Sequence, residues 1–282
     1  MARATYPVLQ GVTIGMAMPL FQMKQVLVDA CHRVYNKGWV ASNDGNLSAR
    51  LDKDRVLCTA TGMSKGLVTP DDLCIIDMDG NKLEGLAHRK PSTEMKVHLM
   101  AYRERPDVMA VVHAHPPYAT GYALAGLDLS DCELPEVVIA LGSIPLTKYG
   151  LPGTEELSEK MKEFIHQSDA FLMELHGVTT VGQSVMNAYF KMETVEHFAK
   201  IDFIARQLGG PKRFSKERAE ELLAARARYG VTTPNIGCRA EGGYAYPPEM
   251  REKPAEQNPT IDDAALIEEV TKRVLQALKS QK

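Results

Sequence analysis

Hydrophobic positions recur at helical spacing over residues 20–37, and Gly38 follows where a left-handed glycine commonly ends a helix. This pattern predicts an amphipathic helix near the start of the chain. Short alternating or β-branched runs come next, over residues 46–50, 56–61 and 73–77, with turn residues between them. They predict strands that are joined by hairpins.

The middle of the chain alternates helical and strand patterns. Ser92 and Thr93 offer capping hydroxyls to a helix over residues 94–102, and a strand over residues 108–115 follows. The further predicted elements are a helix at 118–125, a strand at 137–140, a helix at 154–166, strands at 170–175 and 178–181, and a long helix at 185–208. Together these patterns predict one α/β domain over residues 1–210.

The pattern changes beyond residue 210. Residues 211–259 combine a charged helical stretch with a segment from 230 onward that holds glycines and prolines without an apolar period, so we expect an arm or linker there and no core. Over residues 260–282, Thr260 and Asp263 are spaced like a capping box, and apolar positions follow on one helical face. This predicts a tethered C-terminal amphipathic helix.

Composition narrows the class of protein. A net charge of −3 without blocks of like charge argues against a nucleic-acid surface or a polybasic membrane patch. No apolar run reaches the roughly 20 residues that a membrane span needs, and polar positions interrupt the moderately apolar residues 8–21, so we expect a cytoplasmic protein. The five cysteines are odd in number and contain no CxxC pair, which predicts reduced thiols.

Three histidines are candidates for a metal site. His113 and His115 lie two residues apart at the end of a predicted strand, so both imidazoles point to one face and can reach a single ion. His176 follows another predicted strand and could complete a set of three with an open coordination position. The alternative is three unrelated histidines with backbone partners. His98 and His197 are expected to be interior, and Trp39 to pack in the core.

Glu94 stands at the start of a predicted helix. A carboxylate beside a metal-bound substrate can shuttle a proton from a carbon acid, although the helix dipole alone also favours an acidic residue here. Three clusters of small residues are suited to cradling an anion, through backbone N–H groups, hydroxyls and a helix N-terminus. They are Gly45-Asn46, Thr61-Gly62 and Ser92-Thr93, and turn chemistry would explain each one equally well.

The order and spacing of these motifs resemble a known family. Asp44-Gly45-Asn46-Leu47-Ser48, Thr61-Gly62, Pro91-Ser92-Thr93-Glu94, His113-Ala114-His115 and His176-Gly177 are similar to the motifs of the class II aldolase/adducin family, over about residues 20–208. The resemblance implies a three-layer α/β/α sandwich around a largely antiparallel sheet. It also implies a homotetramer with active sites at subunit interfaces.

The same resemblance implies roles for single residues. His113, His115 and His176 would be the metal ligands, Glu94 the acid/base, and Gly45, Asn46, Thr61, Gly62, Ser92 and Thr93 the phosphate contacts. Two departures are mild: Thr93 replaces a serine, and a leucine precedes His176 where many members have asparagine. A third leaves a role open, because Leu134 stands near the position of the family's general-acid tyrosine. Tyr149, Tyr244 and Tyr246 remain alternatives for that role.

Within the family, the pattern is most similar to the zinc-dependent L-fuculose-1-phosphate aldolases. This implies reversible cleavage of L-fuculose 1-phosphate or L-rhamnulose 1-phosphate to dihydroxyacetone phosphate and L-lactaldehyde. A sugar-acid phosphate decarboxylase, a pentulose-phosphate 4-epimerase and a methylthioribulose-1-phosphate dehydratase are alternatives in the same family, and a non-catalytic adducin-like binding module is one of another class. Residues 260–282 resemble peptides that direct enzymes to the shell proteins of bacterial microcompartments, and packing on the protein's own tetramer is the alternative.

Overall fold

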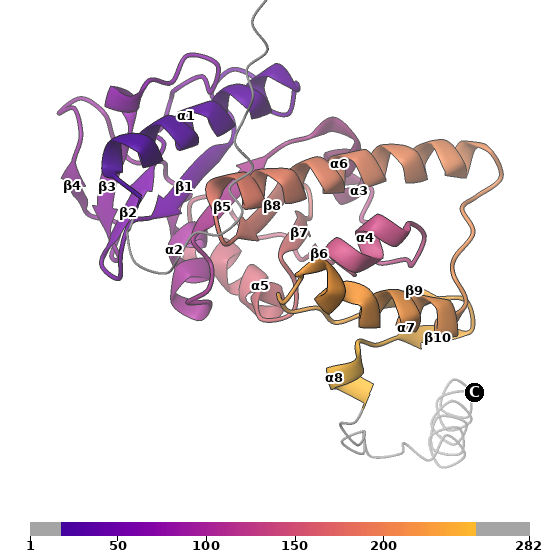
Figure 1. Ribbon diagram of the computed structural model, residues 1–282. Coiled ribbons are helices and arrows are strands. Elements are labelled where there is room, and N and C mark those ends of the chain that lie inside the picture. Colours follow the sequence, from indigo (N-terminus) through magenta and orange to yellow (C-terminus); the bar gives the residue numbers. More distant parts are fainter. Residues whose placement is uncertain (1–17, 252–282) are drawn as a thin grey trace, which may run out of the picture.

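An eight-stranded sheet forms the centre of the computed structural model, which describes residues 18–251 (Figure 1). The strand order is β4-β3-β2-β1-β5-β8-β7-β6, and every neighbouring pair is antiparallel except β6 and β7. The strands are β1 Asn46–Arg50, β2 Arg55–Cys58, β3 Cys74–Asp77, β4 Lys82–Glu84, β5 Ala110–Ala114, β6 Leu146–Thr147, β7 Ala170–Met173 and β8 Gly177–Gly182.

Helices cover both faces of this sheet. One layer comprises α1 (Leu20–Asn36), α3 (Pro117–Leu124) and α6 (Val185–Gln207), and the other comprises α2 (Met95–Glu104) and α5 (Glu155–Ile165). Successive strand residues point to opposite faces, so Val112 packs with the first layer and Val111 with the second. Both faces of the central strands are therefore buried, and the predicted three-layer α/β/α sandwich around a largely antiparallel sheet is confirmed.

The strand predicted at residues 137–140 is wrong, because these residues belong to helix α4 (Pro135–Ala140). Val137 and Val138 gave the segment a β-like composition, but the conformation of a short apolar run depends on what it packs against. Pro135 occupies the first turn, where its fixed φ and missing N–H suit a helix start. Val137 then packs with the main core and Val138 with a separate cluster of residues near the C-terminal end.

That separate cluster overturns the expectation that the chain beyond residue 210 holds no core. Its buried members are Cys132, Val138, Ala219, Leu223, Cys238, Ala240 and Ala245. They come from α4, from α7 (Lys216–Ala225) and from the hairpin of β9 (Cys238–Ala240) and β10 (Gly243–Ala245), while the short helices η2 (Arg226–Tyr229) and α8 (Pro248–Arg251) flank it. Cys238, Ala240 and Ala245 are thus core, contrary to the prediction of an arm without core.

The cysteine prediction also needs correction. Cys132 and Cys238 form a disulfide between the segment before α4 and strand β9, whereas Cys31, Cys58 and Cys74 are free and buried. The odd number and wide spacing of the cysteines gave no sign of this disulfide, because only the packing of β9 brings its two cysteines together. Division of the chain at residues 210 and 260 stays a prediction, and both the apolar residues 8–17 and the C-terminal helix at 260–282 lie outside the described residues.

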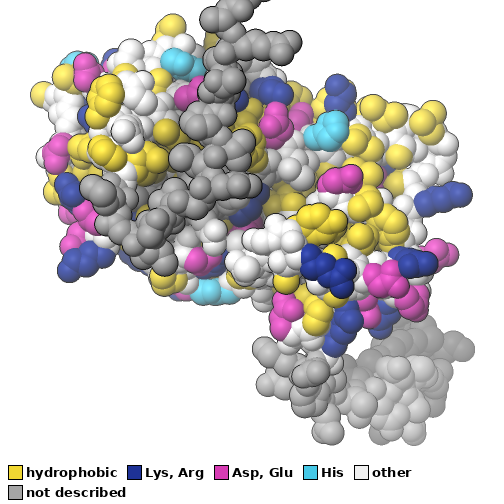
Figure 2. All heavy atoms as spheres, in the orientation of Figure 1, with side chains coloured by type: hydrophobic (Ala, Val, Ile, Leu, Met, Phe, Trp, Pro, Cys, Tyr) yellow, Lys and Arg dark blue, Asp and Glu magenta, His cyan; other side chains and the backbone are white. Residues whose placement is uncertain are grey.

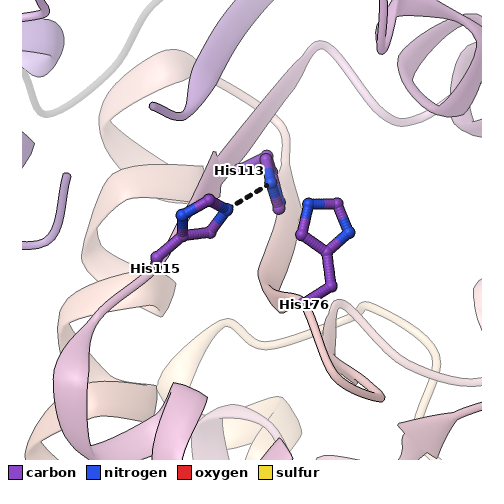
Figure 3. A group of neighbouring side chains, drawn as sticks. All are labelled: His113, His115 and His176. Atoms are coloured by element: carbon purple, nitrogen blue, oxygen red, sulfur yellow. Dashed lines mark hydrogen bonds between the residues drawn. The ribbon is translucent and has the colours of Figure 1, made fainter. Parts of the chain in front are cut away.

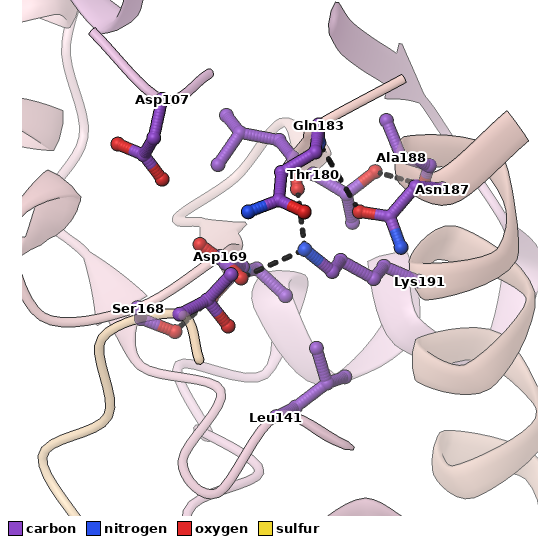
Figure 4. A network of polar contacts seen from close by, with 12 residues as sticks. Asp107, Leu141, Ser168, Asp169, Thr180, Gln183, Asn187, Ala188 and Lys191 are labelled. Atoms are coloured by element: carbon purple, nitrogen blue, oxygen red, sulfur yellow. Dashed lines mark hydrogen bonds and ion pairs between the residues drawn. The ribbon is translucent and has the colours of Figure 1, made fainter. Parts of the chain in front are cut away.

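A buried ionic network fixes one end of the central strands (Figure 4). Asp169, before β7, accepts hydrogen bonds from Lys191 Nζ of α6 at 2.7 Å and from Arg105 Nη1 at 2.6 Å. Lys191 also donates to the carbonyl of Val181 near the end of β8. The network therefore connects α6 to the end of β8 that lies away from His176. The histidines lie at the opposite end of these strands.

Charge is dispersed over the surface. On the face shown in Figure 2, acidic and basic side chains alternate without a broad field of one sign. Over residues 18–251, no helix combines the length and hydrophobicity that crossing a lipid bilayer would require.

Candidate active site

The three predicted histidines lie side by side in the structure (Figure 3). Strands β5 and β8 pair with Ala114 opposite Val178, so the end of β5 meets the turn that carries His176. One ring nitrogen from each histidine lies within 4.8 Å of the other two, and the Nε2 atoms of His113 and His115 are 3.2 Å apart. The sheet register thus brings together residues that are 61 or more positions apart, since 176 − 115 = 61.

Their protonation state suits metal binding. His113 Nδ1 lies 3.0 Å from the carbonyl oxygen of Val178, which can only accept, so Nδ1 carries the proton and Nε2 keeps its lone pair. Burial lowers the pKa of His113 well below its ordinary value and also lowers that of His176, so both rings are neutral. His176 Nδ1 is buried without a hydrogen-bond partner in the described residues. Three imidazoles gathered at one point, with a free lone pair on His113 Nε2 and an unpartnered His176 Nδ1, fit a divalent cation such as zinc.

Local sequence explains how His176 comes so close. A Cβ atom at Gly177 would lie 2.5 Å from Cδ2 of His115 and 2.7 Å from the carbonyl oxygen of Ala114, so only glycine fits after His176. Leu175, before it, has a φ of 57°, in the left-handed region that asparagine tolerates better than leucine. The turn is therefore built around the backbone positions on either side of the histidine.

Glu94 faces the histidines. Its Oε2 atom is 3.4 Å from His113 Nε2, and its Oε1 atom is 3.4 Å from His176 Nε2. Glu94 is the residue before the first turn of α2, but its side chain makes no capping hydrogen bond there. The carboxylate thus points into the histidine cluster, and favourable placement at a helix N-terminus does not by itself account for it.

A buried chain of hydrogen bonds holds Glu94 in place. Asn46 Nδ2 donates to Glu94 Oε2 at 2.7 Å, and His98 Nε2 donates to Asn46 Oδ1 at 2.6 Å. Because His98 Nε2 carries the proton, its Nδ1 accepts from the hydroxyl of Ser48 at 2.7 Å. Burial lowers the pKa of His98 to about 3, so the ring stays neutral. His98 is interior as predicted, but His197 is exposed, contrary to expectation, while Trp39 is buried in the core as predicted.

The three small-residue clusters converge on the same region. Asn46 pairs with His113 in the β1–β5 register, and a Cβ atom at Gly45, whose φ is 71°, would lie 2.9 Å from the carbonyl oxygen of His113. Thr61 N donates to the carbonyl of Lys90 at 2.9 Å, and Ser92 N donates to that of Thr59 at 3.2 Å. These bonds set Thr61-Gly62 beside Ser92-Thr93. Thr61, Gly62 and Thr93 are exposed and open to a ligand.

Two further residues at this site were missed from the sequence. Asp44 Oδ2 is 3.5 Å from His115 Nδ1. Lys65 is only 1% exposed, and its Nζ donates to the carbonyls of Asn43 at 3.1 Å and Met63 at 2.8 Å. Asp44 belongs to a quoted motif and could have been singled out, whereas a lone lysine in a polar loop is ordinarily solvated and gives no signal.

The alternative tyrosines have other contacts. The hydroxyl of Tyr244 lies 3.0 Å from Ser143 Oγ, and the ring of Tyr246 packs 4.9 Å from that of Tyr244. Tyr149 N donates to Glu174. Within residues 18–251 no tyrosine hydroxyl hydrogen-bonds Glu94 or the three histidines.

Comparisons with known proteins give a matching family model and several similar proteins. The family described as Class II Aldolase and Adducin N-terminal domain matches residues 25–203. An L-fuculose phosphate aldolase of Methanococcus maripaludis is 32% identical over 64% of this chain and 96% of its own length. A 3-oxo-tetronate 4-phosphate decarboxylase of Escherichia coli is 36% identical over 60% of this chain and 81% of its own length. A solved L-fuculose 1-phosphate aldolase superposes with a TM-score of 0.69 and 28% identity, over 77% of this chain and 100% of that one.

Proposed function

Because this chain belongs to the class II aldolase and adducin family, we propose that it is a metal-dependent aldolase that cleaves a ketose 1-phosphate. The substrate would be L-fuculose 1-phosphate or L-rhamnulose 1-phosphate, and the products dihydroxyacetone phosphate and L-lactaldehyde. One observation carries the proposal: the Glu94 carboxylate lies 3.4 Å from a ring nitrogen of both His113 and His176. A non-catalytic adducin-like module would have no need of this arrangement.

The metal ligands in this proposal are His113, His115 and His176. A divalent cation held there, which we take to be one zinc ion per subunit, would supply Lewis acidity toward the oxygens of the substrate. The protein's own part is to fix the donors: Val178 sets the tautomer of His113, and Gly177 allows the approach of His115 and His176.

Glu94 is the proton-transfer group in this proposal. When the C3–C4 bond of the ketose phosphate breaks, its electron pair stays on C3, and the C4 hydroxyl gives its proton to a base that a neighbouring subunit would supply as the aldehyde forms. Glu94 in its acid form delivers a proton to C3 and becomes a carboxylate, and in the synthetic direction the carboxylate removes that proton. Asn46 holds Oε2 through its amide, which fixes where the proton is delivered.

The phosphate contacts in this proposal are Gly45, Asn46, Thr61, Gly62, Ser92 and Thr93. Their hydroxyls would bind the phosphate, together with their backbone N–H groups other than those of Thr61 and Ser92, which already donate to carbonyls. This remote binding energy would hold the reacting carbons in register. Asn46 has a double role here, because its amide also donates to Glu94. We further propose a cytoplasmic homotetramer in which a neighbouring subunit completes the site with the missing general acid.

A second candidate function is decarboxylation of a sugar-acid phosphate. The 36% identity to the 3-oxo-tetronate 4-phosphate decarboxylase supports it, and so does Leu134 at the position where the aldolase tyrosine is expected. Loss of carbon dioxide also leaves an electron pair on carbon, so the same histidines and Glu94 would serve. The two reactions differ in whether the leaving fragment is an aldehyde or carbon dioxide.

The test measures bound metal and product release on a small panel of ketose 1-phosphates and 3-oxo-tetronate 4-phosphate. We expect about one zinc per subunit, release of dihydroxyacetone phosphate, and loss of activity on chelation. Glu94→Gln should retain the metal and lose at least about a hundredfold in kcat. Glu104→Gln, at the exposed end of the same helix, is the matched control.

Three results would contradict the aldolase proposal. They are cleavage that survives complete removal of the metal, an unimpaired Glu94→Gln variant, or release of carbon dioxide in place of an aldehyde. The last result would favour the second candidate.

A further inference from the structure

Lys65 is a buried cation whose partners are all uncharged. Its ammonium group donates to the carbonyl oxygens of Asn43 and Met63. Within residues 18–251 no carboxylate oxygen approaches Nζ within the 4.0 Å of an ion pair. A buried ammonium ordinarily has an anionic partner, because removing its charge from water is costly. This lysine therefore has an unmet requirement for negative charge.

The position of Lys65 relates this requirement to the proposed phosphate site. Asn43 is two residues before Gly45, and Met63 directly follows Gly62, so Nζ cross-links the two loops that carry the first two small-residue clusters. None of the six proposed phosphate contacts is itself charged. Burial lowers the pKa of Lys65, and Cys31, Asp44 and Glu94 lie near enough to offset this lowering in part. Neither carboxylate forms an ion pair with the ammonium group.

We propose that Lys65 is the counter-charge for the phosphate group of the substrate, acting from behind the loops that bind it. This inference rests on the proposed function, since it takes the ligand of these loops to be a phosphate monoester dianion. The bound dianion would place a negative charge near the Lys65 ammonium group, whose hydrogen-bond partners in residues 18–251 are both carbonyls, and Lys65 would in turn strengthen the N–H donors of both loops toward an anion. It is a positioning and electrostatic residue, because its Nζ contacts the loops and does not reach into the open site.

A purely structural role is the competing explanation. Two hydrogen bonds to carbonyls would cross-link the loops whether or not the donor is charged, so the test must separate charge from cross-linking. Lys65→Gln keeps amide donors without the charge, and Lys65→Met removes both. Lys53→Met is the matched control, because Lys53 is exposed and its ion-pair partner is the neighbouring Asp54.

The experiment titrates inorganic phosphate into each full-length protein by calorimetry and records zinc content and melting temperature in parallel. We expect Lys65→Gln and Lys65→Met to raise the Kd for phosphate about tenfold, with zinc content unchanged. Both should also lower kcat/KM for a ketose 1-phosphate relative to the unphosphorylated ketose, whereas Lys53→Met should change neither. A merely structural lysine would impair both sugars alike.

The outcomes separate this inference from the proposed function. Phosphate binding and sugar preference that are unchanged in Lys65→Gln would overturn the role of Lys65 and leave the aldolase proposal standing. If Lys65→Met does not fold, the measurements on Lys65→Gln, which retains hydrogen-bond donors, decide the test. A wild-type protein that neither binds phosphate nor distinguishes phosphorylated from free ketose would overturn both.

Discussion

At the residue scale, the orientation of Glu94 depends on a side chain that never touches the site. His98 is fully buried and neutral, and its Nε2–H sets which way the amide of Asn46 points. With that donor removed, the amide can rotate and its Nδ2 no longer has to face Glu94. We therefore expect His98→Leu to lower kcat about tenfold to a hundredfold while zinc content stays the same, as measured by steady-state kinetics and metal analysis.

The exposed His197→Leu serves as the control for this change. Since burial of a leucine in place of an imidazole could disturb packing, the melting temperature of each variant is measured as well. A His98→Leu protein with normal kcat would show that Asn46 holds Glu94 without help, and one that loses zinc would show that His98 supports the metal ligands directly.

The sequence predicted some of these residues and could not predict others, for a physical reason. His113, His115 and His176 are recognisable as candidate metal ligands from their residue type. The strand end and the turn that carry them follow from local sequence patterns. The bond from Asn46 to Glu94 spans 48 positions and depends on how β1 lies against α2. The sequence predicted that Asn46 contacts a phosphate ligand. It could not predict the hydrogen bond from Asn46 to the carboxylate of Glu94. Lys65 escaped notice because burial of a lysine is a property of the packed loops.

At the scale of elements, the junction between α4 and α6 contains a carboxylate whose ionisation opposes folding. Burial, with Asp202 of α6 and Asp131 nearby, raises the pKa of Glu133 from 4.5 to about 8, and Arg206 offsets this in part. The folded state then holds a proton that the unfolded state has lost. The free energy of unfolding must fall as the pH rises from about 4.5 to about 8, and the loss is complete above that range.

Glu133→Gln removes this titration. Between about pH 5 and about pH 9, we expect the melting temperature of the variant to fall less than that of the wild type. Thermal unfolding at a series of pH values measures this difference. Glu136→Gln, on the exposed side of α4, should keep the wild-type pH dependence. Parallel curves for wild type and Glu133→Gln would show that Glu133 is ionised in the folded protein.

The elements beyond residue 210 are fastened by the disulfide. Cys132 and Cys238 are 106 positions apart, so their bond restricts a long loop of the unfolded chain and holds β9 against the segment before α4. We expect dithiothreitol to lower stability by about 2 to 5 kcal/mol, seen as a lower melting temperature. The double variant Cys132→Ser, Cys238→Ser should be equally destabilised and insensitive to the reagent. Five thiols titrated in the denatured, unreduced protein would contradict the pairing.

At the scale of the whole molecule, the histidine site lies at one end of the central sheet, and a buried ionic network holds the other end in place. β5 and β8 carry the histidines at one end, while Lys191 joins Asp169 and the end of β8 at the other. The alternating helical and strand patterns predicted an α/β domain, and the family resemblance implied its three layers. The C-terminal cluster was not predictable, because its small buried residues have no apolar period and become core only when β9, β10 and α7 pack on α4.

The three histidines and Glu94 lie within residues 18–251, more than 80 positions before the amphipathic pattern predicted at 260–282. We therefore expect that pattern to act apart from the histidine site. If it is an address for microcompartment shell proteins, deleting residues 260–282 should leave zinc content, melting temperature and kcat/KM unchanged and abolish co-purification with co-expressed shell proteins. If it instead packs on the protein's own tetramer, the deletion should lower the molecular mass in solution, and light scattering distinguishes the two outcomes.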